Sequence, residues 1–312
     1  MTITLKEGFK TPTALVDWVE IRVSLKSKSH PGHIKRAYEQ QGVSRATPLD
    51  VGDGGAASEF DIRIQHPRNY AAVETIVNDL DASYGFISSP KLIAIEVSID
   101  FYHESADFSA LMAMTERLML SIAPPVANNP RVHGYSGGLF LSKDEINATR
   151  TLYIGNETDD LMWRVYWKRT DDTVEGLDGR RIAKPLPDSE FRARVEVRLQ
   201  GKALGLFQID MVSDLSNFAF EKLHTESLFK FARRDERVGA LFTNDYSIYT
   251  AKSLGIDDES PAFVLNRFNR KDKRRRDIQL SRSLKTDIEL TEASRNSLRR
   301  LTKRFSLKHP AL

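Results

Sequence analysis

The run KLIAIEVSIDFY, from Lys91 to Tyr102, constrains the fold of this chain more than any other stretch. Its side chains alternate with a period of two, which is the repeat of a β-strand with one apolar face. The apolar face carries Ile93, Ile95, Val97, Ile99 and Phe101, and the opposite face carries Ala94, Glu96, Ser98 and Asp100. Glu96 and Asp100 lie about 13 Å apart on such a strand. They are too far apart to hold one ion alone, but each could join a site with residues of neighbouring strands.

Similar patterns surround this strand and predict an α+β fold. Alternation predicts strands at Val16–Leu25 and Glu59–Gln65, and amphipathic spacing predicts helices at Ile34–Gln41, Asn69–Tyr84 and Phe108–Ile122. The order β-α-β-α-β-α is typical of antiparallel or mixed sheets with packed helices, either ferredoxin-like or built from duplicated β-α-β units.

The rest of the chain divides into a strand-rich and a helix-rich part. We predict strands at Val132–Leu141, Thr151–Gly155, Leu161–Arg169 and Arg192–Gln200, and a loop at Thr170–Pro187. Beyond them the spacing predicts helices at Leu215–Ala232, Asp257–Phe268 and Thr286–Phe305. We therefore expect an α+β domain over residues 1–212 and a helical, basic C-terminal region over residues 213–312.

The strand Arg192–Gln200 carries an unusual polar face. Arg192, Arg194, Glu196 and Arg198 lie on one side, and Ala193, Val195, Val197 and Leu199 on the other. The pattern predicts one face in the core and one in solvent. Three arginines around one carboxylate suit a surface that binds phosphates, and they equally suit a solvated face with cross-strand ion pairs.

Charge and composition narrow the class of protein. The chain has 312 residues, no Cys and a formal net charge of +3, so disulfides, thiolate metal sites and Cys nucleophiles are excluded. From Leu265 to Leu312 there are 15 Lys and Arg against 5 Asp and Glu, a net of +10, so the remainder carries 31 − 38 = −7. We find no apolar signal core or membrane span and expect a cytoplasmic protein that contacts nucleic acid and no membrane.

Three stretches in order resemble a known family. They are Thr151-Leu-Tyr-Ile-Gly155, Trp163-Arg-Val-Tyr-Trp-Lys168 and Arg194-Val-Glu-Val-Arg-Leu-Gln200. Together they resemble the replication initiation factor family of rolling-circle plasmids and filamentous phages, whose members show a YIGS strand, an RIYDK-like strand and an R-x-E-x-x-L-K strand. Asp100 resembles the Asp of an earlier strand in that family. The resemblance covers Lys91 to about Met211 and implies a replication-initiator-like fold.

The resemblance implies a metal-dependent site. In the family, carboxylates position a divalent ion, which implies Mg²⁺ or Mn²⁺ at Asp100 and Glu196 here. A family Tyr then attacks DNA, but Leu206 or Phe207 occupies its position, and Arg198 replaces a second acid. The candidates for a displaced nucleophile are Tyr246 and Tyr249 in NDYSIYTAK, with Tyr38 and Tyr166 as further alternatives.

Basic residues mark the expected DNA contact. On the sheet they are Arg164, Lys168, Arg192, Arg194 and Arg198, and near the C-terminus they form the run Arg270, Lys271, Lys273, Arg274, Arg275 and Arg276. Arg295, Arg299, Arg300, Lys303 and Arg304 are spaced to form a cationic stripe along the last helix. Such a run could otherwise be a solvated linker and helix, but the excess of +10 favours phosphate contacts.

Three functions therefore stay open. The first is a DNA-binding protein of a plasmid, phage or integrated mobile element, acting at a replication or transfer origin. The second is an active metal-dependent nickase with a displaced Tyr, and the third is a non-catalytic DNA-binding regulator. Further partners to consider are a second copy of the chain and a host helicase.

Overall fold

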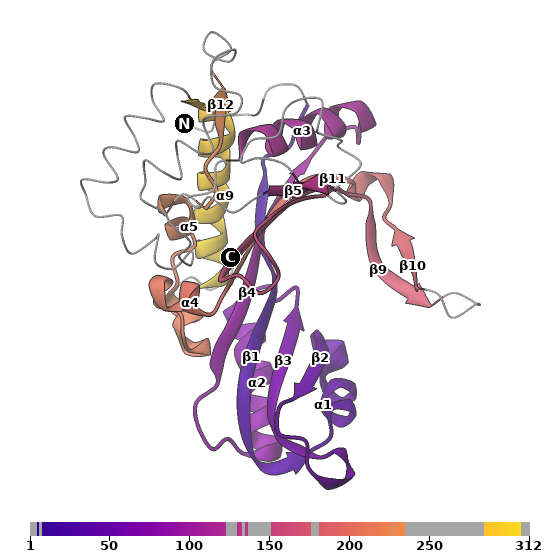
Figure 1. The fold of residues 1–312 in the computed structure, drawn as a ribbon, viewed down its shortest axis with the longest axis vertical. Coiled ribbons are helices and arrows are strands. Elements are labelled where there is room, and N and C mark those ends of the chain that lie inside the picture. Colours follow the sequence, from indigo (N-terminus) through magenta and orange to yellow (C-terminus); the bar gives the residue numbers. More distant parts are fainter. Residues whose placement is uncertain are drawn as a thin grey trace. The chain divides into compact units, whose positions relative to one another are not determined.

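The computed structural model describes residues 5, 8–122, 130–132, 135–136, 151–175, 181–226, 228–234 and 284–306. Figure 1 shows its helices and strands. The strands are β1 Thr13–Ser29, β2 Val43–Pro48, β3 Ala57–Gln65, β4 Lys91–Tyr102, β5 Pro130–Val132, β6 Tyr135–Ser136, β7 Leu152–Ile154, β8 Leu161–Lys168, β9 Thr170–Glu175, β10 Arg181–Pro185, β11 Arg192–Gln200, β12 Ala232–Arg234 and β13 Leu284–Thr286. The helices are α1 Pro31–Tyr38, α2 Tyr70–Tyr84, α3 Phe108–Ser121, α4 Lys202–Phe207, α5 Glu221–Thr225 and α9 Ile288–Phe305.

The predicted α+β class is confirmed. The main sheet has the hydrogen-bonded order β2-β3-β1-β4-β11-β8-β7-β5-β6. The pairs β1–β3, β2–β3, β5–β6, β5–β7 and β7–β8 are antiparallel. The described residues form two compact units, one of Ala14–Ser98, Arg198–Lys222 and Leu298–Leu312, the other of Met1–Thr13, Ile99–Val197 and Leu223–Ser297. No described helix has the length and apolar character needed to span a membrane.

The unit that contains residues 14–98 has a ferredoxin-like arrangement. Its elements follow the order β1-α1-β2-β3-α2-β4, and its strands lie in the order β2-β3-β1-β4. The edge strand β2 was not predicted, because only Val43 of its six residues is buried and the strand ends at Pro48. An edge strand with one buried residue leaves no alternating apolar signal in the sequence.

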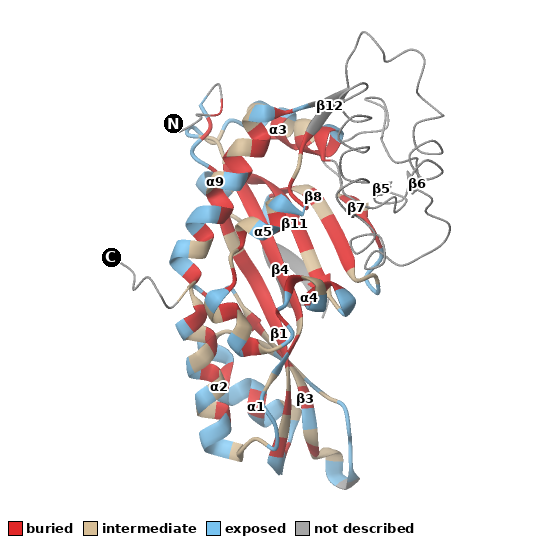
Figure 2. Ribbon diagram, turned by 90° about the vertical axis from the view of Figure 1, so that its left-hand side faces the viewer, coloured by how far each residue is buried: buried red, intermediate tan, exposed pale blue. Residues whose placement is uncertain are grey.

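The core of this unit follows the predicted alternation. Ile21 pairs with Ile62 and Val23 with Phe60 across β1 and β3, and all four side chains are buried. Helices α1 and α2 lie together on one side of these strands (Figure 2). They are joined where the Tyr38 hydroxyl donates to the carbonyl of Asp79 at 3.1 Å. The predicted helix over Asn69–Tyr84 is confirmed, and Asn69 caps it by accepting from the amide of Ala72.

In the other unit, α3 packs on β8 and is joined to the start of α9. Trp163 of β8 is fully buried, and its Nε1 donates to the carbonyl of Leu228 at 2.9 Å. Arg117 of α3 donates to Asp287 at 2.9 Å and to Glu289 at 2.8 Å, at the start of α9. These bonds fix the ends of helices that are far apart in the sequence.

Two sequence predictions in the later part of the chain were wrong. The expected loop Thr170–Pro187 contains the hairpin β9–β10, in which Val174 pairs with Ile182 as the one apolar pair of the register. The expected helix Leu215–Ala232 is instead a 3-10 segment, the five-residue α5 and the strand β12. Its apolar side chains are buried as predicted, but residues buried in an irregular chain can mimic helical spacing.

The last predicted helix is confirmed as α9, with Leu290, Leu298, Leu301 and Phe305 buried along one side. The helix expected at Asp257–Phe268 lies outside the described residues, as does most of the strand expected at Val132–Leu141.

Candidate functional site

Asp100 of β4 forms buried ion pairs with two arginines of β11. Arg194 donates to both carboxylate oxygens, with Nε at 2.5 Å from Oδ1 and Nη2 at 2.7 Å from Oδ2. Nε of Arg192 lies 3.1 Å from Oδ2. The carboxylate of Asp100 is fully buried, so its charge is balanced by the arginines and not by water.

Glu196 of β11 is contacted by polar side chains of β8 and of its own strand. Nη2 of Arg164 lies 2.6 Å from its Oε2, and Nη1 of Arg194 lies 3.3 Å from its Oε1. The Tyr166 hydroxyl donates to Oε1 at 2.6 Å. The register of alternate residues on β8 places Arg164 and Tyr166 on the same side of the sheet as Glu196.

Tyr166 is held as a neutral phenol. Burial raises its pKa well above its ordinary value, and the negative charge of Glu196 raises it further. Because the phenol keeps its proton, it acts as a hydrogen-bond donor that orients Glu196. It would become an effective nucleophile only if another group took up that proton.

Glu96 of β4 is oriented by a tryptophan. Nε1 of Trp18 in β1 donates to Oε1 of Glu96 at 2.8 Å, and both residues are buried. The guanidinium of Arg63 lies 4.0 Å from the centre of a Trp18 ring, which holds the indole in place. The neighbouring Asp17 has its main-chain carbonyl bound by the amide of His66 at 2.7 Å.

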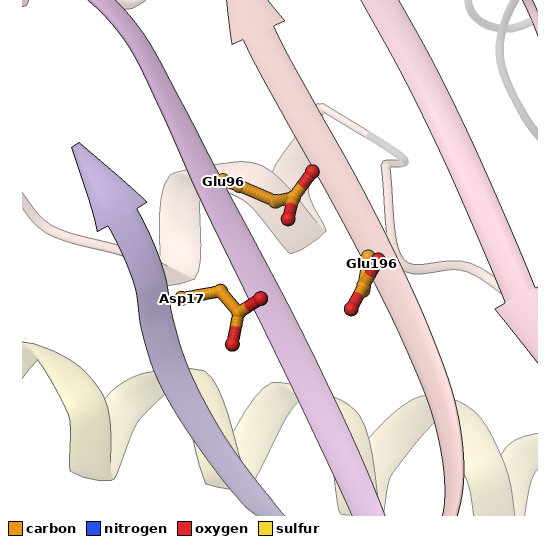
Figure 3. A group of neighbouring side chains, drawn as sticks. All are labelled: Asp17, Glu96 and Glu196. Atoms are coloured by element: carbon orange, nitrogen blue, oxygen red, sulfur yellow. The ribbon is translucent and has the colours of Figure 1, made fainter. Parts of the chain in front are cut away.

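Asp17, Glu96 and Glu196 form the group of carboxylates that could hold a metal ion. In the part of the chain that the structure describes, one oxygen of each lies within 4.8 Å of the others, and all three residues are buried. Figure 3 shows them on the neighbouring strands β1, β4 and β11. Oxygen ligands of this kind suit hard divalent cations better than soft ones. Three buried carboxylates repel one another, so a cation would relieve an unfavourable arrangement.

Part of this carboxylate group was predicted from the sequence. Glu196 was predicted as a ligand, and Glu96 was noted on the same strand face as Asp100. The structure brings Glu96 to Glu196 and leaves Asp100 outside the group, engaged with Arg194. Asp17 was missed because it lies on a distant strand, and only the order of the strands reveals its neighbours.

The predicted solvent-facing side of β11 was wrong. Arg194 is 1 % exposed and Glu196 is 1 % exposed, and Arg192 is also buried. The four charged residues of β4 and β11 satisfy one another, so both faces of the strand are buried. Contact of Arg192 or Arg194 with DNA would require their ion pairs with Asp100 to open. Arg164 and Arg198 are half-buried, and Lys168 is buried.

The cationic stripe of α9 is exposed, as its spacing predicts. Arg295, Arg299, Arg300, Lys303 and Arg304 all face solvent. Arg304 is nevertheless partly covered: it donates to the carbonyl of Ala14 at 2.6 Å, and this partial burial, with the neighbouring Arg300, lowers its pKa. The basic run Arg270 to Arg276 and the two candidate nucleophiles Tyr246 and Tyr249 lie outside the described residues.

Comparisons with known proteins give little further guidance. No family model and no curated protein matches the sequence. A solved structure described as a rolling circle replication initiator protein from Geobacillus stearothermophilus is similar at 13 % identity and a TM-score of 0.33. The match covers 75 % of this chain and 90 % of that one. At this identity and TM-score, the likeness does not establish a shared fold or a shared function.

Proposed function

We propose that this chain is a DNA-binding protein of a plasmid, phage or integrated mobile element, that it acts at a replication or transfer origin, and that it holds Mg²⁺ or Mn²⁺. The observation that carries the proposal is the group of buried carboxylates at Asp17, Glu96 and Glu196 beside Arg164. The ordered motifs from Lys91 to Met211 support it through their resemblance to replication initiation factors.

The carboxylates would hold the cation, and the neighbouring arginine would bind a DNA phosphate. A divalent cation bound there would polarise a phosphodiester and stabilise negative charge on its oxygens. Trp18 and Tyr166 fix the orientation of Glu96 and Glu196 through their hydrogen bonds of 2.8 Å and 2.6 Å. Such outer hydrogen bonds hold metal ligands in position and tune their affinity.

The exposed cations of α9 would supply the more general contact with the DNA backbone. Each phosphate neutralised by Lys or Arg adds about 0.9 to the slope of log affinity against log salt. Replacing Arg295, Arg299 and Lys303 with Ala should therefore weaken DNA binding and flatten that slope by about 2–3. We leave Arg304 out because it also holds the carbonyl of Ala14.

The test is DNA binding at several salt concentrations, with Lys35→Ala/Arg36→Ala on α1 as the matched control, since both of these cations are exposed. An unchanged slope in the α9 variant would contradict a role for this stripe. The same experiment with Arg274, Arg275 and Arg276 replaced by Ala tests the basic run. A footprint at a promoter in place of an origin would favour the regulator.

A second candidate function is DNA strand nicking, and the contact between Tyr166 and Glu196 favours it. The phenolic oxygen would attack phosphorus and form a tyrosyl phosphodiester, while the bond from phosphorus to a deoxyribose oxygen breaks. Glu196 would take the phenolic proton and pass it to the leaving sugar oxygen, so that one proton moves from the phenol to the alcohol. One ester replaces another, so no oxidant or reductant is needed.

Nicking is tested with supercoiled DNA from the protein's own element and Mg²⁺ or Mn²⁺, analysed on a denaturing gel. Tyr166→Phe should abolish the covalent protein–DNA product, and Tyr84→Phe, at the end of α2, should not. If Tyr166→Phe still forms the product, Tyr166 is not the nucleophile, and the attached peptide would show whether Tyr246 or Tyr249 is. If the wild type forms no product with either metal, DNA binding without strand cleavage would be the function that stands.

A further inference from the structure

Phe108 is an exposed aromatic ring at the first turn of α3. It is 51 % exposed. The other large hydrophobic side chains that are exposed among the described residues are aliphatic. Its ring packs edge-to-face on Trp167 of β8, with centroids 4.3 Å apart and an interplanar angle of 87°. The ring is therefore held in a fixed orientation with half of its surface in water.

Trp167 is fixed from three sides. The guanidinium of the exposed Arg169 lies 4.6 Å from the centre of its ring, and Phe191 meets it edge-on at 6.0 Å. Trp167 itself is 6 % exposed, and its Nε1 has no hydrogen-bond partner among the described residues. Its position is thus set by aromatic and cation–π contacts, which present Phe108 and Arg169 outward.

We infer that Phe108, Trp167, Arg169 and Phe191 form a stacking patch for an unpaired base of single-stranded nucleic acid. Every nucleobase has a π-face, and proteins that bind single strands stack bases on exposed aromatic rings and on the planes of arginine side chains. Phe108 offers such a ring, and Arg169 offers such a plane already stacked on an indole.

The charges around the stacking patch favour stacking over phosphate binding. The patch carries charges of both signs. Lys168 and Arg169 are basic, whereas Asp107, which caps α3 just before Phe108, and Glu190, which precedes Phe191, are acidic. This mixture of signs would attract a bare phosphate chain only weakly. A base stacked on Phe108 would gain affinity that depends little on salt, unlike a purely electrostatic contact.

The stacking patch and the candidate site share the strand β8 but lie on opposite faces of it. Trp167 follows Tyr166 directly, so its side chain points to the face opposite the one on which Tyr166 touches Glu196. In this one respect the inference rests on the proposed function, because the partner is nucleic acid. It adds a requirement that the proposed function does not contain, namely an unpaired base bound on the Trp167 face of β8.

The test uses the full chain and a short fluorescent oligo-dT strand, with EDTA present so that metal binding plays no part. Fluorescence anisotropy should show that Phe108→Ala weakens binding roughly tenfold or more, while the salt slope stays the same. Phe108→Trp should keep the affinity, and Arg169→Lys should lower it because it keeps the charge and loses the planar group. Leu120→Ala, at an exposed position near the other end of α3, is the control.

Three results would overturn the inference. Equal affinity of Phe108→Ala and Leu120→Ala would exclude a stacking role for the ring. Wild-type binding that is equally tight to a strand of abasic sugar-phosphate would show that bases do not contribute. A wild type that binds no single strand would also overturn it, whereas metal binding and a duplex footprint at an origin are measured separately and test the proposed function.

Discussion

Replacing Glu96 with Gln should stabilise the metal-free protein, and it should also remove the stabilisation that a divalent cation gives. An oxygen of Glu96 and an oxygen of Asp17 lie within 4.8 Å of each other. At an effective dielectric constant of 20, two full charges at that distance repel by about 332/(20 × 4.8), or roughly 3.5 kcal/mol. Nearby arginines reduce this value, so we expect a gain of about 1–3 kcal/mol.

Gln is a conservative replacement at this position. Its side-chain oxygen can still accept the hydrogen bond that Nε1 of Trp18 donates at 2.8 Å. The variant therefore loses charge without leaving the buried indole unpaired. Most buried substitutions destabilise a protein, so a gain in stability is a distinctive outcome.

Urea unfolding with EDTA and with Mn²⁺ measures both effects. Mn²⁺ at 100 times its dissociation constant should stabilise the wild type by about 2.7 kcal/mol and should stabilise Glu96→Gln far less. Glu39→Gln, at an exposed acid after α1, should behave like the wild type in both media. The reasoning is refuted if Glu96→Gln is less stable in EDTA than the wild type, or if Mn²⁺ stabilises both equally.

Two further predictions concern stability. Asp100→Asn should lower the free energy of unfolding by about 3–5 kcal/mol, because it leaves the buried Arg194 without its carboxylate; a loss below about 1 kcal/mol in urea unfolding would contradict the buried ion pair. Burial, with Lys230 and Arg295 nearby, lowers the pKa of His224 to about 4, below its ordinary value of 6.5. The unfolded chain then binds more protons between these values, so stability should fall as the pH drops from 6.5 towards 4, by about 1–2 kcal/mol after allowing for partial exposure. His224→Gln should flatten this dependence of stability on pH. If the free energy of unfolding of both proteins changes with pH in parallel, His224 is not its cause.

Local patterns in the sequence predicted the elements that have one continuous apolar face. The strand β4 and the helix α9 are examples, because their apolar residues recur at a period of two or of about 3.6 in the sequence. The hairpin β9–β10 escaped prediction because it belongs to a separate two-stranded sheet with a single apolar pair in its register. A register with one apolar pair leaves no alternating pattern in the sequence.

The candidate site was less accessible from the sequence, for a different reason. Trp18 and Glu96 are 78 residues apart, and Tyr166 and Glu196 are 30 apart, so their contacts depend on which strands become neighbours. The arginines of β11 were recognised as unusual, but the partner that buries them, Asp100, lies 94 residues from Arg194. A pattern along one strand shows which side chains share a face, and strand order decides what that face meets.

The most direct test of the account is a footprint of the full chain on DNA from its own element, taken with and without Mn²⁺. We expect protection of one segment at a replication or transfer origin, at a lower protein concentration with Mn²⁺ than without it. The Glu96→Gln variant should lose the effect of Mn²⁺. Protection that is uniform along the DNA, or that Mn²⁺ changes equally in the wild type and in Glu96→Gln, would contradict it.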